Sequence, residues 1–254
     1  MNQNINSIKI NDDLVLSQSE KGLTFGTDAY LLAAFMKGGA RKVAADLGSG
    51  TGVISLLCQS RDKFKHVYAV EIQQIFASII EKNIADNTLG EKMSVICSDL
   101  RDVKAASIGG EIDCVFSNPP YMKADSGKRN EHDEKFIARH EVHGNITDFC
   151  ACASRLLKHG GKFYTVWRPD RLTDLLCALR ENKLEPKVII FVHAYPSAPP
   201  SMILTEAVKG GASGNKLYSP LYLSDSIEDS KSSILSKDAQ NIYDTCSFED
   251  FLNK

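Results

Sequence analysis

KVAADLGSGTG, residues 42–52, is the stretch that decides the fold, because an apolar run passes there into a glycine-rich loop. Residues 42–47 are predicted to form a buried strand, and residues 53–60 continue as a helix. Gly48, Gly50 and Gly52 let the backbone turn tightly and approach a ligand closely. A strand, a glycine loop and a helix in this order are typical of a nucleoside-binding α/β fold.

Apolar runs alternate with helix-like stretches from about residue 42 to about residue 208. Further predicted strands cover 66–71, 93–97, 112–117 and 162–167. Further predicted helices cover 74–86, 147–158 and 169–182, with His159, Gly160 and Gly161 ending the second of them. Two last strands, 188–193 and 202–208, have only a short link and are expected to pair antiparallel at one edge. Repeated βα units predict an α/β fold with a mostly parallel sheet and helices on both faces.

Composition limits the class of protein. The chain has 254 residues, 43% of them hydrophobic, and a net charge of −2, so nucleic-acid binding would rest on a local basic patch. Its seven cysteines form no Cys-x-x-Cys pair, which favours a reducing, cytoplasmic setting and no metal site. No signal sequence or membrane span is predicted. We expect one domain over 1–225 and a tail of unknown role over 226–254.

Acidic residues stand at the ends of three successive predicted strands. Asp46 precedes the glycine loop and suits a cofactor that carries an ammonium and a sulfonium rather than phosphates. Glu71 lies where a carboxylate can hold both ribose hydroxyls. Asp99 can accept a hydrogen bond from an adenine amino group while Leu100 packs on the ring; Asp99 could also be only a turn residue. An NAD-type site is the alternative that a glycine loop leaves open.

This ordered set resembles the class I S-adenosylmethionine-dependent methyltransferases. The resemblance implies a Rossmann-like, seven-stranded sheet in the order 3-2-1-4-5-7-6. Residues 25–30, FGTDAY, resemble an upstream segment of the amino-methyltransferase branch. Carried over by position, Thr27 and Asp28 would contact the methionine end of the cofactor. Either residue could also cap a helix over 29–36, and both readings can hold at once.

Asn118, Pro119, Pro120 and Tyr121 follow the fourth strand and are the predicted catalytic residues. An exocyclic aromatic amine is a poor nucleophile, because its lone pair is delocalised into the ring. The Asn118 side-chain oxygen and the Pro119 carbonyl can each accept one of its N–H groups and favour the pyramidal nitrogen of the transition state. Tyr121 can stack on the base. A rigid turn is the alternative reading of the prolines. In the family that the chain resembles, the tetrad marks methylation of planar amines.

The overall pattern is similar to bacterial methyltransferases that modify adenine N6 in the anticodon loop of a valine tRNA. The resemblance covers roughly residues 10–222 and implies an RNA substrate, expected to be a tRNA. It includes the late segment 209–214, which is flexible and cationic. Predicted RNA contacts are Lys123, Lys128, Arg129, Arg139 and Lys209. A solvated loop over 122–141 and a hairpin-end loop over 209–214 are the alternatives.

Other activities share parts of this pattern. A release-factor glutamine methyltransferase normally carries a helical N-terminal domain, and only about 40 residues precede the first predicted strand here. An rRNA guanine-N2 enzyme usually has a second large domain, and a DNA adenine enzyme needs a target-recognition region. A non-catalytic RNA-binding module of the same fold also remains open, although Asp46, Glu71 and Asn118 are all present. No obligate protein partner is inferred.

Overall fold

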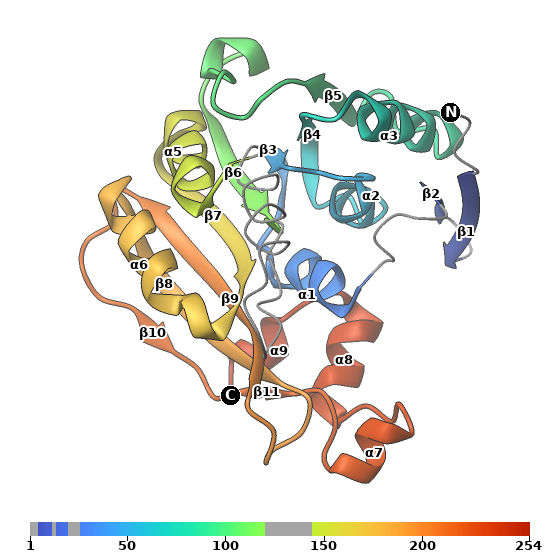
Figure 1. The fold of residues 1–254 in the computed structure, drawn as a ribbon, viewed down its shortest axis with the longest axis vertical. Coiled ribbons are helices and arrows are strands. Elements are labelled where there is room, and N and C mark those ends of the chain that lie inside the picture. Colours follow the sequence, from blue (N-terminus) through green and yellow to red (C-terminus); the bar gives the residue numbers. More distant parts are fainter. Residues whose placement is uncertain (1–4, 12–13, 20–25, 120–143) are drawn as a thin grey trace, which may run out of the picture.

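One large sheet organises the computed structural model, which describes residues 5–11, 14–19, 26–119 and 144–254 (Figure 1). Its strands follow the order β10-β8-β9-β7-β6-β3-β4-β5, with β11 also paired to β8. When β3 to β9 are numbered one to seven along the chain, the order from β5 reads 3-2-1-4-5-7-6. The predicted core order is therefore confirmed, and the two short strands β10 and β11 extend it.

The strands that were predicted lie close to their expected bounds. The parallel strands are β3 Gly39–Leu47, β4 Phe64–Glu71, β5 Met93–Cys97, β6 Ile112–Ser117 and β7 Leu157–Trp167. The antiparallel hairpin is β8 Leu184–His193 and β9 Pro200–Lys209, and β9 also pairs antiparallel with β7. The added edge strands are β10 Lys216–Leu217 and β11 Leu221–Tyr222, both parallel to β8.

Helices cover both faces of the sheet (Figure 1). On each face, one apolar cluster lies between the sheet and its helices. One face carries α1 Thr27–Phe35, α2 Val53–Gln59 and α3 Gln74–Asp86. The other carries the single-turn η1 Ala105–Ile108, then α5 Ile146–Leu156 and α6 Leu172–Glu181, the last preceded by the short turn η2 Pro169–Arg171. Successive residues of β3 belong to opposite clusters, Ala44 to the first and Ala45 to the second. This follows because side chains along a strand point alternately to the two faces of the sheet.

The predicted end of the helix over 147–158 is wrong. Helix α5 stops at Leu156, and Leu157 already has extended backbone with ψ of 141°. Leu157 is fully buried and pairs with Ile112, so it belongs to β7. The glycines that suggested a helix end lie instead in β7, next to a register shift against β6. Burial of Leu157 in the sheet therefore prevails over the local glycine signal.

Both ends of the chain contribute structure that the sequence did not predict. Strands β1 Ile5–Asn11 and β2 Leu14–Ser19 form a separate antiparallel hairpin. Leu14 and Leu16 of this hairpin are buried in the first apolar cluster. The hairpin therefore packs on the domain as part of its core.

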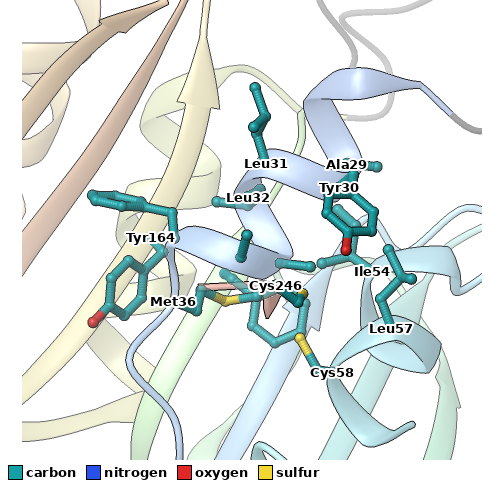
Figure 2. Packing of buried hydrophobic residues seen from close by; sticks show 14 of the residues in the cluster. Ala29, Tyr30, Leu31, Leu32, Met36, Ile54, Leu57, Cys58, Tyr164 and Cys246 are labelled. Atoms are coloured by element: carbon teal, nitrogen blue, oxygen red, sulfur yellow. The ribbon is translucent and has the colours of Figure 1, made fainter. Parts of the chain in front are cut away.

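The tail after residue 225 forms three helices, α7 Ile227–Lys231, α8 Lys237–Thr245 and α9 Glu249–Leu252. Tyr30 of α1 stacks on Tyr243 with ring centroids 4.6 Å apart and donates its hydroxyl to the Tyr243 carbonyl. Figure 2 shows Cys246 close to Met36 and Cys58 in the same core. The domain boundary expected at residue 225 stays a prediction. Within the described ranges, no helix has the length and apolar character needed to cross a membrane.

Candidate active site

The carboxyl ends of β3, β4 and β6 meet at one edge of the sheet, because these strands are parallel neighbours. The loop after β3 is fixed there by the end of β4. The N–H groups of Gly48 and Ser49 both donate to the Val70 carbonyl, at 2.9 and 3.0 Å. Gly50 has a φ of 57°, and a Cβ added there would meet no atom within 4 Å. The loop therefore presents bare backbone to open space, as the sequence pattern requires of a ligand-binding loop.

Glu71 lies beside this loop, as its position at a strand end predicted. Its side chain accepts the Gly50 N–H and the Gln73 N–H, each at 2.9 Å. The residue is only 4% exposed. A carboxylate held by two backbone donors is fixed in direction and keeps lone pairs for further donors. Its predicted role as the ribose ligand stays a prediction.

Asp46 lies beneath the loop and is 1% exposed. Its carboxyl accepts the Ser55 hydroxyl at 2.7 Å, which links the end of β3 to the first turn of α2. Burial raises the pKa of Asp46 to about 7, the Ser55 hydrogen bond opposes this shift, and the nearby Glu71 charge adds to it. A nearby cation would favour its ionised form. Ser55 was missed by the sequence analysis, although a serine on the apolar face of a helix is a recognisable signal.

Asp99 and Leu100 follow β5, the next strand along this edge. Asp99 accepts hydrogen bonds from the backbone N–H and the side chain of Arg101, the former at 2.9 Å. Leu100 is 5% exposed and belongs to the second apolar cluster. The structure therefore places both residues at the predicted edge, with Asp99 engaged by Arg101. Their contacts with an adenine ring stay predictions.

Asp28 and Asn118, which are 90 positions apart in the sequence, are brought together at the end of β6. Asn118 Nδ2 donates to Asp28 Oδ2 at 2.9 Å, while Asp28 Oδ1 accepts the Ala29 N–H. The amide nitrogen, which is the donor of this side chain, therefore faces Asp28. The opposite atom, Asn118 Oδ1, is buried and has no hydrogen-bond partner in the part of the chain that the structure describes. A buried acceptor left in this state is suited to a donor from a ligand.

The start of α1 corrects one interpretation. The helix begins at Thr27 with Gly26 as its N-cap and without a side-chain cap hydrogen bond, so the alternative in which Thr27 or Asp28 caps a helix over 29–36 is wrong. Thr27 is exposed, and with Asp28 it lines a hollow of about 220 Å³. The other lining residues are Trp167, Arg168, Ser201 and Met202. This hollow therefore adjoins the pair of Asp28 and Asn118. The methionine contacts predicted for Thr27 and Asp28 stay predictions.

Of the remaining predicted site residues, the structure describes Lys209 and Pro119, and six others lie outside the described residues. Lys209 lies at the amino end of the parallel strands, where its ammonium donates to the Leu157 carbonyl and pairs with Glu111 at 3.4 Å. It is therefore not brought to the edge that holds Asn118, and its RNA contact stays a prediction. Pro119 is buried directly after Asn118. Outside the described residues lie Pro120, Tyr121, Lys123, Lys128, Arg129 and Arg139.

No three side chains of His, Cys, Asp or Glu gather as a metal-binding group within the described ranges. All seven cysteines are unbridged. The described residues at this edge of the sheet offer carboxylates, an amide and backbone groups.

The model of the methyltransferase small domain family matches residues 17–176, which include the glycine loop, Glu71 and Asn118. The chain belongs to the methyltransferase small domain family. Membership agrees with the observed strand order and with the placement of polar residues at the carboxyl edge.

Comparison with individual proteins points to the same fold. A tRNA1(Val) (adenine(37)-N6)-methyltransferase of Porphyromonas gingivalis is 28% identical over 197 residues, which cover 75% of this chain and 76% of that protein. A predicted O-methyltransferase of Agrobacterium tumefaciens has a TM-score of 0.63 at 21% identity and covers 83% of this chain and 98% of its own. M. jannaschii TYW2 in complex with AdoMet has a TM-score of 0.53 at 16% identity, with 82% and 86% covered.

Proposed function

We propose that the chain transfers a methyl group from S-adenosylmethionine to the N6 amino group of an adenosine in the anticodon loop of a tRNA. The observation that carries the proposal is the buried Asn118 Oδ1, which lacks a hydrogen-bond partner among the described residues while Asp28 fixes the amide nitrogen. The activity named for the Porphyromonas gingivalis relative supports the choice of substrate.

The residues around the glycine loop fit S-adenosylmethionine. The backbone at Gly50 is open to approach, and Glu71 is already oriented by the Gly50 and Gln73 N–H groups. Glu71 would hold the ribose hydroxyls, and Asp46 would supply negative charge beneath a cofactor that carries two cationic groups. When bound, this cofactor supplies an electrophilic methyl group on a sulfonium. The protein's task is then to present a nucleophilic nitrogen in line with it.

Asn118 would perform that task by accepting an N–H of the target amine. As the nitrogen pyramidalises, its N–H groups become more acidic, and an acceptor already in place stabilises the transition state more than the ground state. The Pro119 carbonyl is the second candidate acceptor. Asp28 would act through Asn118, because its bond to Nδ2 keeps Oδ1 turned away from α1.

The hollow beside Asp28 offers room for the incoming nucleotide. Trp167 and Met202 give it apolar surface, and Arg168, held by Asp170 at 2.9 Å, gives it a cation. A base must leave its stack to reach such a site, which is easiest in a single-stranded loop. A tRNA anticodon loop therefore suits the site better than a paired helix.

Transfer of a labelled methyl group to tRNA, followed by digestion to nucleosides and mass spectrometry, tests the proposal. We expect the label on N6-methyladenosine, and we expect an isolated anticodon stem-loop to outperform a fully paired duplex of the same sequence. Label on a guanine, on a ring carbon or on a protein glutamine would contradict the adenine-N6 assignment. Binding of RNA without any transfer would favour a non-catalytic module.

A further inference from the structure

Two asparagines at the end of α3 hold the outer edge of strand β2. Asn83 Oδ1 accepts the Ser17 N–H at 2.7 Å, and Asn83 Nδ2 donates to the Ser17 carbonyl at 3.2 Å. Asn87 repeats this pattern on Val15, with distances of 2.9 and 2.7 Å. Each side-chain amide therefore pairs with one residue of β2 in the way that a neighbouring strand would.

The spacing of the two elements explains this match. Residues two apart in a strand turn their N–H and C=O groups to the same edge and lie about 6.8 Å apart. Residues four apart on a helix share a face and are separated by about 6 Å along its axis. Asn83 in the last turn of α3 and Asn87, the C-cap residue four positions later, can therefore serve Ser17 and Val15 together. Asn83 interrupts the apolar stripe of α3, and that interruption is the signal that a sequence reader could have used.

The third hydrogen bond distinguishes Asn83 from Asn87. Asn83 Nδ2 also donates to the Thr51 carbonyl at 3.0 Å. Thr51 stands between two glycines of the loop after β3, which is called the cofactor loop from here on. The second N–H of Asn87 goes instead to the Asn83 carbonyl at 2.7 Å. Asn83 is 0% exposed, so water cannot replace these bonds when one partner moves. One buried amide therefore joins the N-terminal hairpin to the loop.

The peptide between Thr51 and Gly52 has a second restraint inside the loop. The Gly52 N–H donates to the Ser49 carbonyl at 2.8 Å, which helps to set the direction of the Thr51 carbonyl in the same peptide plane. Ile80, one turn before Asn83, lies where a Cβ added to Gly52 would be 3.2 Å from its side chain. Asn83 therefore adds a restraint that comes from α3 and holds the loop and the hairpin together.

We propose that Asn83 is a positioning residue for the cofactor loop, and that through it docking of the β1–β2 hairpin and binding of the cofactor strengthen each other. This inference rests on the proposed function, in which the loop binds S-adenosylmethionine. Coupling between two sites is reciprocal. A ligand on the loop must therefore tighten hairpin docking by the same factor by which the docked hairpin tightens ligand binding.

The test combines two measurements on the full chain with S-adenosylhomocysteine as the probe. In the wild-type protein, saturating ligand should slow amide exchange at Val15 and Ser17 by about fivefold or more. In matched variants, Asn83→Ala and Asn87→Ala should both speed exchange in β2. Asn83→Ala should also weaken ligand binding by about tenfold, because it alone releases the Thr51 carbonyl, whereas Asn87→Ala should weaken it less, through looser docking of the hairpin alone.

The outcomes separate this inference from the proposed function. Wild-type ligand affinity in Asn83→Ala, with faster exchange in β2, would overturn the coupling and leave the cofactor site intact. Unchanged exchange at Ser17 on ligand addition would overturn it as well, and this arm needs no variant should Asn83→Ala fail to fold. A wild-type protein that binds no S-adenosylhomocysteine would contradict the proposed function, and the coupling with it.

Discussion

The carboxyl and amino ends of the parallel strands differ in how far their polar groups are buried and in what those groups bond to. At the carboxyl end, Asp46 and Glu71 are almost fully buried and are held by hydroxyl or backbone donors. There too, Asn118 keeps a buried oxygen that no described residue satisfies. A folded protein leaves few such atoms, and those that remain often await a ligand.

At the amino end, charges pair with one another near the surface. Lys209 pairs with Glu111, and Lys158 pairs with Asp113 although its side chain is 53% exposed. Exposed pairs of this kind contribute little to stability. Ion pairs near the surface also occur at the carboxyl end, Arg101 with Asp99 among them. What sets that end apart is therefore its buried carboxylates and the buried Asn118 oxygen, and not the number of its charges.

Removing the Asn118 acceptor should have the largest effect. Asn118→Ala is expected to lower the rate of methyl transfer on the order of 10²–10³, as the loss of one preorganised hydrogen-bonding group does at other active sites. S-adenosylhomocysteine affinity should stay within about twofold, because Asn118 is assigned to the target amine. Single-turnover transfer and a binding titration measure the two quantities. Wild-type turnover in this variant would contradict the mechanism.

Glu71 should affect binding more than chemistry. Glu71→Ala removes the carboxylate that fixes the Gly50 N–H, and with it the proposed ribose ligand. Hydrogen bonds to a charged group contribute about 1.5–3 kcal/mol, so cofactor affinity should fall by about ten- to a hundredfold. Glu71→Gln keeps one oxygen acceptor and should lose less. Calorimetric titration would decide, and unchanged affinity in both variants would remove the assignment.

Asp46 should make stability depend on pH. Its pKa is raised to about 7 in the folded protein, so the native carboxyl stays protonated where the unfolded one is ionised. The unfolded state therefore binds fewer protons, and stability should fall by about 2 kcal/mol between pH 5 and pH 7 and then level off. Asp46→Asn should abolish this part of the slope. Urea unfolding at both pH values measures it, and an identical slope in the variant would refute the account of Asp46.

The smallest effect is expected at the amino end. If Lys209 contacts an RNA phosphate, as its sequence context predicted, Lys209→Glu should weaken RNA binding and its salt dependence. Lys209 already donates to the Leu157 carbonyl and pairs with Glu111, so we predict that Lys209→Glu changes RNA affinity by no more than about twofold. Arg168→Glu is the matched variant at the carboxyl edge and should weaken RNA binding more. Equal losses in the two variants would break the distinction between the two ends.

Much of the fold could be predicted from the sequence, because each strand of the core contains an apolar run. The misses have a common cause. In both β7 and β2, tertiary contacts decide the structure and local preference does not. Leu157 is buried in the sheet, so β7 begins before its glycines. Asn83 hydrogen-bonds the edge of β2 that no described strand pairs with. Such contacts join residues far apart in the chain, and a single sequence does not reveal them.

The site could be predicted as a set of residues but not as an arrangement. Asp46, Glu71 and Asn118 were identified because strand ends meet at one edge. The sequence could not indicate that Asp28 bonds to Asn118 or that Asp46 is almost fully buried, because both depend on how α1 and α2 pack over the loop. Burial in turn sets the pKa of Asp46, so this property was also beyond prediction.

A double-mutant cycle on Asp28 and Asn118 tests the central claim most directly. The claim is that Asp28 acts on the reaction by holding the amide whose oxygen accepts the target amine. Single-turnover methyl transfer would be measured at saturating cofactor for the wild type, Asp28→Ala, Asn118→Ala and the double variant. The account predicts that the double variant is no slower than Asn118→Ala alone, because the two residues work as one unit. Independent losses that multiply in the double variant would contradict it.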